Sequence, residues 1–256
     1  MGLKATRLAN QPSTYFFIGR LSDPGSRFQV QDAQLGGGLK LAVFWDAIVI
    51  SGPTVDSFAA LRPRVQKAFD LTTAAYVFKS KSPIDCRLEN WVEALNVSTD
   101  GVVGRFLRPS QPPPPIAPTR SPVNTPWRLA ARLNRLYVAS KVTENHVLAL
   151  RDYQLAVLDP SDNAFIYAYR AVEDICRSVS GQPDIDAPAW AVTNNTLNIS
   201  QQLTDPLRLA SIAIRHNVQS TVAQANLATA RASRTQTIDI AHQVIAKEMA
   251  RTFPWF

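Results

Sequence analysis

The chain has few cysteines and histidines, and their spacing argues against a local metal site. Its 2 cysteines, Cys86 and Cys176, stand far apart, and neither belongs to a Cys-x-x-Cys pair. The 3 histidines, His146, His216 and His242, are too scattered to form a zinc motif. We therefore expect reduced, packed cysteines, no metal ion and no other cofactor.

The chain also lacks an apolar run of the roughly 18 residues that a membrane-spanning helix needs. Its best apolar run, residues 41–50, contains Asp46. Residues 1–15 have no apolar core after their basic side chains, so no secretory signal is evident. The sequence thus predicts a cytoplasmic protein without a membrane segment.

Proline is abundant in one place only. Of the 18 prolines, 8 fall within residues 108–126, where four are consecutive. Proline fixes φ and removes a backbone donor, which favours an extended and semi-rigid spacer over a packed core. We interpret residues 1–108 as one domain of unknown role, 109–126 as a linker, and 127–256 as a second domain.

The first half alternates short apolar runs with turn residues, which predicts strands at residues 14–21, 28–30, 39–50, 87–95 and 102–107. Three consecutive glycines, residues 36–38, are followed by a strand and not by Lys-Ser or Lys-Thr, so they indicate a turn and not a phosphate loop. Apolar residues at helical spacing predict a helix over residues 55–78, which Pro63 should kink or restart. The expected result is a helix on a small, mainly antiparallel sheet.

The second half changes to helical periodicity. The clearest apolar stripe runs through Phe165, Tyr169, Val172, Cys176 and Val179. Helices are predicted at residues 127–140, 144–158, 162–179, 188–197, 205–216 and 237–251. The whole chain is therefore expected to be α+β, with an all-α antiparallel bundle as its C-terminal domain.

Positive charge is concentrated near the middle of the chain, within a formal net charge of +7. No acidic residue lies between Asp100 and Glu144, although basic residues recur there. Among them, Arg128, Arg132 and Arg135 are spaced i, i+4 and i+7, so they share one face of a helix. That face is either simply solvated or follows a nucleic-acid backbone.

A second group of charged residues lies beside the apolar stripe, within the helix predicted at residues 162–179. Arg170, Glu173 and Arg177 are spaced so that Glu173 can pair with both arginines on the helix surface. In the alternative interpretation, Glu173 orients Arg215 in a shared polar cleft.

Three passages of the second half resemble the HEPN superfamily of helical bundles, in a branch of bacterial two-part proteins. They are LALRDYQLAVLDPSDNAFIYAYRAVEDI (148–175), APAWAVTNNTL (187–197) and ASIAIRHN (210–217). The resemblance covers about residues 143–252 and implies a helical bundle that forms a homodimer. Many HEPN proteins are metal-independent endoribonucleases, so the resemblance also implies RNA as a partner.

The HEPN signature is an arginine, a polar neighbour and then a histidine a few residues on. On this chain the resemblance implies that Arg215, His216 and Glu173 form the catalytic group, with Arg208 and Asn217 binding beside them. An arginine can hold a scissile phosphate, and a histidine can move the proton of a ribose 2′-hydroxyl.

The sequence departs from this signature, because residues 220–222, where the second histidine should fall, contain none. Arg215, His216 and Asn217 also suit a helix C-terminus, where cations complement the helix dipole and Asn adopts a left-handed conformation. Two hypotheses therefore stand. The protein binds or cleaves RNA, or it is a non-catalytic interaction protein that dimerises through its helical domain.

Overall fold

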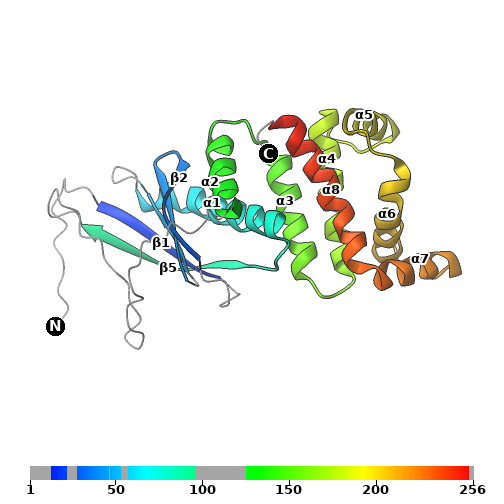
Figure 1. The fold of residues 1–256 in the computed structure, drawn as a ribbon, viewed down its shortest axis with the longest axis horizontal. Coiled ribbons are helices and arrows are strands. Elements are labelled where there is room, and N and C mark those ends of the chain that lie inside the picture. Colours follow the sequence, from blue (N-terminus) through cyan, green and yellow to red (C-terminus); the bar gives the residue numbers. More distant parts are fainter. Residues whose placement is uncertain (1–12, 22–27, 46, 53–56, 96–124, 254–256) are drawn as a thin grey trace.

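A computed structural model describes residues 13–21, 28–45, 47–52, 57–95 and 125–253. In this part of the chain an antiparallel sheet is followed by a helical bundle, so the predicted α+β class is confirmed (Figure 1). The strands are β1 (Ser13–Leu21), β2 (Phe28–Gly36), β3 (Leu39–Trp45), β4 (Ala47–Ser51) and β5 (Cys86–Leu95).

The described strands form one sheet in the order β2-β3-β4-β1-β5, and all neighbours are antiparallel. Alternate side chains face the core, as period-2 patterning requires: Tyr15 and Phe17 of β1 and Ile48 and Ile50 of β4 are buried. The predicted strand at residues 28–30 is too short. The strand continues through Ala33, Gln34 and Gly36, which also pair with β3, and register shifts mark bulges before Ala33 and before Gly36.

The three glycines form the turn that the sequence predicts between β2 and β3. Gly36, Gly37 and Gly38 all have positive φ angles, of 94°, 56° and 78°, which favour glycine. The turn also lies against a helix, because a Cβ atom at Gly36 would stand 3.1 Å from the Cα atom of Arg135. The glycines therefore permit both the tight turn and the close approach.

Helix α1 (Phe58–Ser80) starts at Ser57, whose side chain accepts a hydrogen bond from the Ala60 N–H, and ends at Lys81. The helix continues through Pro63, which is exposed and lies near the N-terminal end of α1. In the second half of α1, every residue from Leu71 to Phe78 is buried. A helix buried all round must be covered on several sides.

The remaining helices form the bundle. They are α2 (Thr125–Val138), α3 (Glu144–Leu158), α4 (Asn163–Ser180), α5 (Ala187–Leu197), α6 (Gln201–Arg215), α7 (Thr221–Ala232) and α8 (Arg234–Thr252). Helix α4 contacts α3, α5, α6 and α8, and it ends at Gly181 with a positive φ of 69°, as the sequence predicts.

Two bundle helices differ from the prediction. Helix α6 begins at Gln201, not at residue 205, because Ser200 caps it and Pro206 is tolerated inside it. Helix α7 was not predicted, because it buries only Leu227 and Ala230 and so has no clear apolar stripe. Its start is nevertheless marked by Ser220, which accepts a hydrogen bond from the backbone of the helix.

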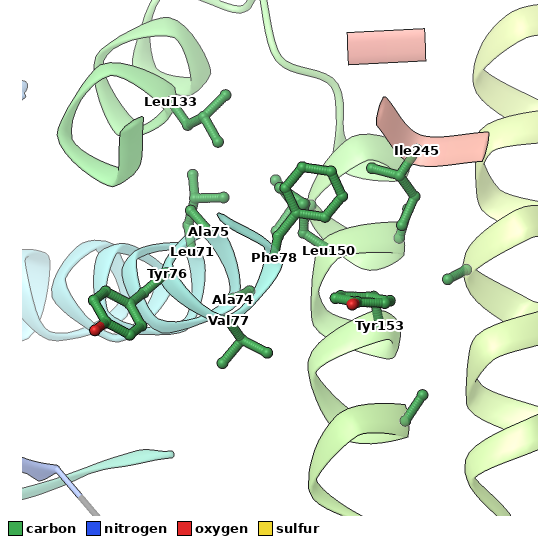
Figure 2. Close-up of a cluster of buried hydrophobic side chains, with 14 of the residues drawn as sticks. Leu71, Ala74, Ala75, Tyr76, Val77, Phe78, Leu133, Leu150, Tyr153 and Ile245 are labelled. Atoms are coloured by element: carbon green, nitrogen blue, oxygen red, sulfur yellow. The ribbon is translucent and has the colours of Figure 1, made fainter. Parts of the chain in front are cut away.

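Helix α1 joins the sheet to the bundle, because it packs against β1 and β5 and also against α2 and α3. Figure 2 shows Phe78, at the end of α1, beside Leu150 and Tyr153 of α3. The ring of Phe78 stacks on that of His242 of α8 at 4.4 Å, and His242 Nε2 donates to the Phe78 carbonyl at 3.1 Å. One hydrophobic core therefore runs from the sheet into the bundle.

Some predictions concern residues that the structure does not describe, and one concerns a division that the structure does not test. The strand at residues 102–107 and most of the 109–126 linker lie outside the described residues, and the division into two domains stays a prediction. Cys86 and Cys176 are buried free thiols, as expected. None of the described helices combines the length and apolar character needed to cross a membrane.

We expect Phe78→Ala to lower the free energy of unfolding by about 3–5 kcal/mol, because it leaves a cavity where α1, α3 and α8 meet. If the core is shared, far-UV circular dichroism and tryptophan fluorescence in urea should still report one common transition. Val222→Ala is the control, since this side chain is 71% exposed and should change stability by less than about 0.5 kcal/mol. Separate transitions for sheet and bundle in the wild type would contradict the shared core.

Candidate nucleic-acid interface

The structure distributes the predicted site residues over two regions of the bundle. Helices α4 and α6 carry one group, consisting of Arg170, Glu173, Arg177, Arg208, Arg215, His216 and Asn217. Helix α2 carries the other, consisting of Arg128, Arg132 and Arg135. Figure 1 shows α2 beside α1 near the sheet, whereas α6 lies toward the far end of the bundle.

Arg215 and Glu173 are brought together, although the spacing on α4 predicted that Glu173 would pair with Arg170 and Arg177. Arg215 Nη1 and Nη2 donate to Glu173 Oε1 and Oε2 at 3.5 and 3.4 Å. The alternative that Glu173 orients Arg215 is therefore the one that the contacts favour. The prediction for the other two arginines was wrong, because more buried carboxylates attract them.

The face of α4 that meets α6 explains how Arg215 is positioned. Tyr169 and Glu173 are one helical turn apart, so they stand above one another on this face. The Arg215 guanidinium lies 5.6 Å from the centre of the Tyr169 ring, within range of a cation–π contact. On another side, Tyr169 stacks against Trp190 of α5 with ring centres 6.4 Å apart. Burial raises the pKa of Tyr169 to about 12, so its hydroxyl stays protonated at neutral pH.

Two buried aspartates pair with Arg170 and Arg177, the arginines that the spacing on α4 predicts to pair with Glu173. Arg170 Nε lies 3.0 Å from Asp152 Oδ2, and Arg177 Nη1 donates to Asp174 Oδ1 at 2.8 Å. The first pair is a close ionic contact and not an aligned hydrogen bond, because Asp152 Oδ2 has no hydrogen-bond partner. Sequence spacing alone does not reveal Asp152, because it belongs to α3 and its partner belongs to α4.

Burial governs the protonation of both aspartates. It raises the pKa of Asp152 to about 6, an effect that Arg170 opposes and Asp174 reinforces. Burial also raises the pKa of Asp174, and Arg177 opposes the rise. Both carboxyl groups are therefore easier to protonate than exposed aspartates.

All four arginines of this group on α4 and α6 are ion-paired. Arg208 is held by Asp205 at 2.9 Å, in addition to the three pairs described above. When the carboxylates are ionised, the four pairs carry no net charge. This region therefore gives little long-range attraction for a polyanion, which depends on net positive charge.

The end of α6 has the geometry of an ordinary helix terminus. His216 is the C-cap residue and is exposed, and Asn217 has a φ of 47°, in the left-handed region. The predicted left-handed asparagine is confirmed. His216 stays a candidate for proton transfer by its position beside Arg215.

The other predicted arginines belong to α2. Arg132 and Arg135 are exposed, while the opposite side of α2 buries Leu133 and Asn134 against α1. The side chain of Arg128 lies outside the described residues. Within the part of the chain that the structure describes, α2 itself contains no acidic residue.

We expect the pKa of Asp152 to make stability depend on pH. Because folding raises this pKa from an ordinary 3.8 to about 6, the native state binds the proton more tightly than the unfolded chain. The resulting stabilisation is complete below pH 3.8 and is lost as pH rises through 6. The stability of the wild type relative to Asp152→Asn should thus fall by about 1 kcal/mol between pH 5 and 7.5. Urea unfolding at several pH values measures this difference, and a constant difference would contradict the account.

The comparisons with known proteins cover the bundle. Residues 131–248, from within α2 to within α8, match a family described as the C-terminal domain of a domain of unknown function (DUF8168). Neither the curated proteins nor the solved structures gave a match. The match spans less than half of the chain, so what it establishes is a similarity of the helical bundle to that domain.

Proposed function

We propose that the protein binds RNA and that the arginine face of α2 makes its phosphate contacts. The face consists of Arg132 and Arg135, and the sequence spacing adds Arg128 to it. The observation that carries this proposal is the exposure of Arg132 and Arg135 on a helix without acidic residues. The helix belongs to a longer stretch, between Asp100 and Glu144, that also lacks acidic residues. Exposed arginines can contact a phosphate backbone and release its counterions.

The ion pairs on α4 and α6 support the choice of this face over the region around Arg215. Each of those arginines has a carboxylate within 3.5 Å. The spacing along α2 also suits a linear partner, because side chains at i, i+4 and i+7 form a stripe about 10 Å long. The resemblance to HEPN bundles supports RNA as that partner, and it suggests a homodimer in which two such stripes would be present.

RNA binding is tested with fluorescently labelled single-stranded RNA and the full chain over a range of salt concentrations. We expect the affinity to fall steeply with salt, and Arg132→Gln/Arg135→Gln to make the log–log slope shallower by about 1.4, or about 0.7 for each lost phosphate contact. The matched control is Arg208→Gln/Arg231→Gln. It removes the same charge from two arginines that lie outside the α2 face, on α6 and α7, and it should leave the slope nearly unchanged.

The outcomes separate the two hypotheses. Equal effects of the two double variants would overturn the assignment to α2. Absence of salt-dependent RNA affinity, together with salt-insensitive self-association, would instead support a non-catalytic protein that dimerises through the bundle.

A second candidate function is metal-independent RNA cleavage at the end of α6, where Glu173 fixes the orientation of Arg215. The guanidinium has five N–H groups, and the two hydrogen bonds to Glu173 leave three for a phosphate. In this reaction the ribose 2′-oxygen attacks the adjacent phosphorus and the bond to the 5′-oxygen breaks. His216 takes the 2′-hydroxyl proton, and a water molecule gives a proton to the leaving oxygen, so the products are a 2′,3′-cyclic phosphate and a 5′-hydroxyl end.

Cleavage is tested by incubating RNA with the protein in excess chelator and analysing the product ends. We expect cyclic-phosphate ends that disappear with Arg215→Ala, while Arg170→Ala, on the same surface, retains activity. Intact RNA under all conditions, with binding preserved, would remove cleavage and leave RNA binding as the function.

A further inference from the structure

A cavity outside the proposed RNA interface opens at the end of the bundle where α3 begins and α4 ends. Its volume is about 660 Å³, and it is lined by Thr143, Asn145, Arg177, Ser178 and residues 181–183. The cavity is shallow and mostly open to solvent, so a ligand in it stays partly exposed. Gly181 leaves the rim open, because a Cβ atom there would meet nothing within 4 Å.

Behind the cavity wall, a buried histidine fixes the Ser178 hydroxyl. The Thr143 backbone N–H donates to His146 Nδ1 at 3.1 Å, so Nδ1 is an acceptor and Nε2 carries the hydrogen of the neutral ring. His146 Nε2 lies 3.2 Å from both Glu248 Oε1 and Ser178 Oγ. The single Nε2 hydrogen lies between these two acceptors, so Ser178 Oγ cannot donate to His146 and its own hydrogen is available to a group in the cavity.

This arrangement excludes a serine nucleophile activated by His146. A catalytic histidine must accept the serine proton, whereas here the nitrogen that faces Ser178 already carries a hydrogen. The acid also contacts the same nitrogen as the serine and not the opposite one. The buried His146–Glu248 pair thus positions a hydrogen-bond donor.

The carboxylate of Glu248 does not oppose an anion in the cavity. It is 1% exposed, and Arg251 holds it through two hydrogen bonds of 2.7 and 2.8 Å. Thr252 also donates to it at 2.9 Å. Its charge is therefore satisfied within the protein, away from the cavity.

Arg177 supplies the cationic side of the cavity in a fixed orientation. Its Nε donates to the Pro183 carbonyl at 3.1 Å and its Nη1 donates to Asp174. These two contacts leave the Nη2 donors, and the side chain is 35% exposed. Asn145 adds an amide and belongs to the first turn of α3, where backbone N–H groups lack helical partners.

We propose that this cavity binds the phosphate group of a small ligand through Arg177 and the Ser178 hydroxyl. Unlike long-range attraction of RNA, which depends on net charge, this recognition depends on two hydrogen-bond donors at the end of α4 that both line the cavity. It is independent of the proposed function, because the α2 arginines take no part in it. The phosphate could be inorganic or belong to an ester such as a nucleotide.

The test is isothermal titration of the full chain with inorganic phosphate, a nucleoside monophosphate and acetate. We expect saturable binding of at least one phosphate compound, at least tenfold weaker in Arg177→Gln and at least threefold weaker in Ser178→Ala. Arg208→Gln is the matched control. Like Arg177, Arg208 pairs with an aspartate three residues away, and its side chain is 34% exposed. The phosphate affinity of this variant should equal that of the wild type.

The relative affinities of inorganic phosphate and the nucleotide identify the source of the phosphate group. Circular dichroism should show that each variant keeps its helical content, and RNA affinity should be unchanged in Arg177→Gln. Absence of saturable binding by both phosphate compounds, acetate binding as tight as phosphate, or an equal loss in Arg208→Gln would overturn the proposal.

Discussion

The burial of the second half of α1 on all sides is the constraint on which the rest of the structure depends. Neither a single sheet face nor a single helix can cover eight consecutive residues, so β1 and β5 must combine with α2 and α3. This requirement places α2 against the turn of β2 and β3 and sets where α3 begins. The arginine face of α2 and the cavity at the start of α3 both take their positions from that packing.

Electrostatics adds a second level of organisation, because buried carboxylates need partners. Asp152 and Asp174 draw Arg170 and Arg177 away from Glu173, which leaves Glu173 to meet Arg215. The four arginines of α4 and α6 therefore add little positive electrostatic potential to that surface, because each is paired with a carboxylate. The region of α2 differs in its sequence, because no acidic residue lies between Asp100 and Glu144.

Local signals in the sequence predicted much of the fold. Caps, glycine turns and apolar stripes gave the α+β class and the bounds of α3 and α4 to within a residue. Local signals do not predict contacts between distant residues. Arg215 and Glu173 are 42 positions apart, and their contact was one of two alternatives for the partner of Glu173. Helix α7 was missed because Leu227 and Ala230 are too few to produce a helical stripe. The α4 pairing failed because spacing on one helix says nothing about a carboxylate on its neighbour.

Native-state hydrogen exchange of the full chain tests the shared core most directly. The account predicts that backbone amides in the buried half of α1 exchange only through global unfolding, with the same free energy as the most protected amides of α3 and α4. Exchange of the α1 amides at a clearly lower free energy, together with those of the sheet while the bundle stays protected, would contradict it.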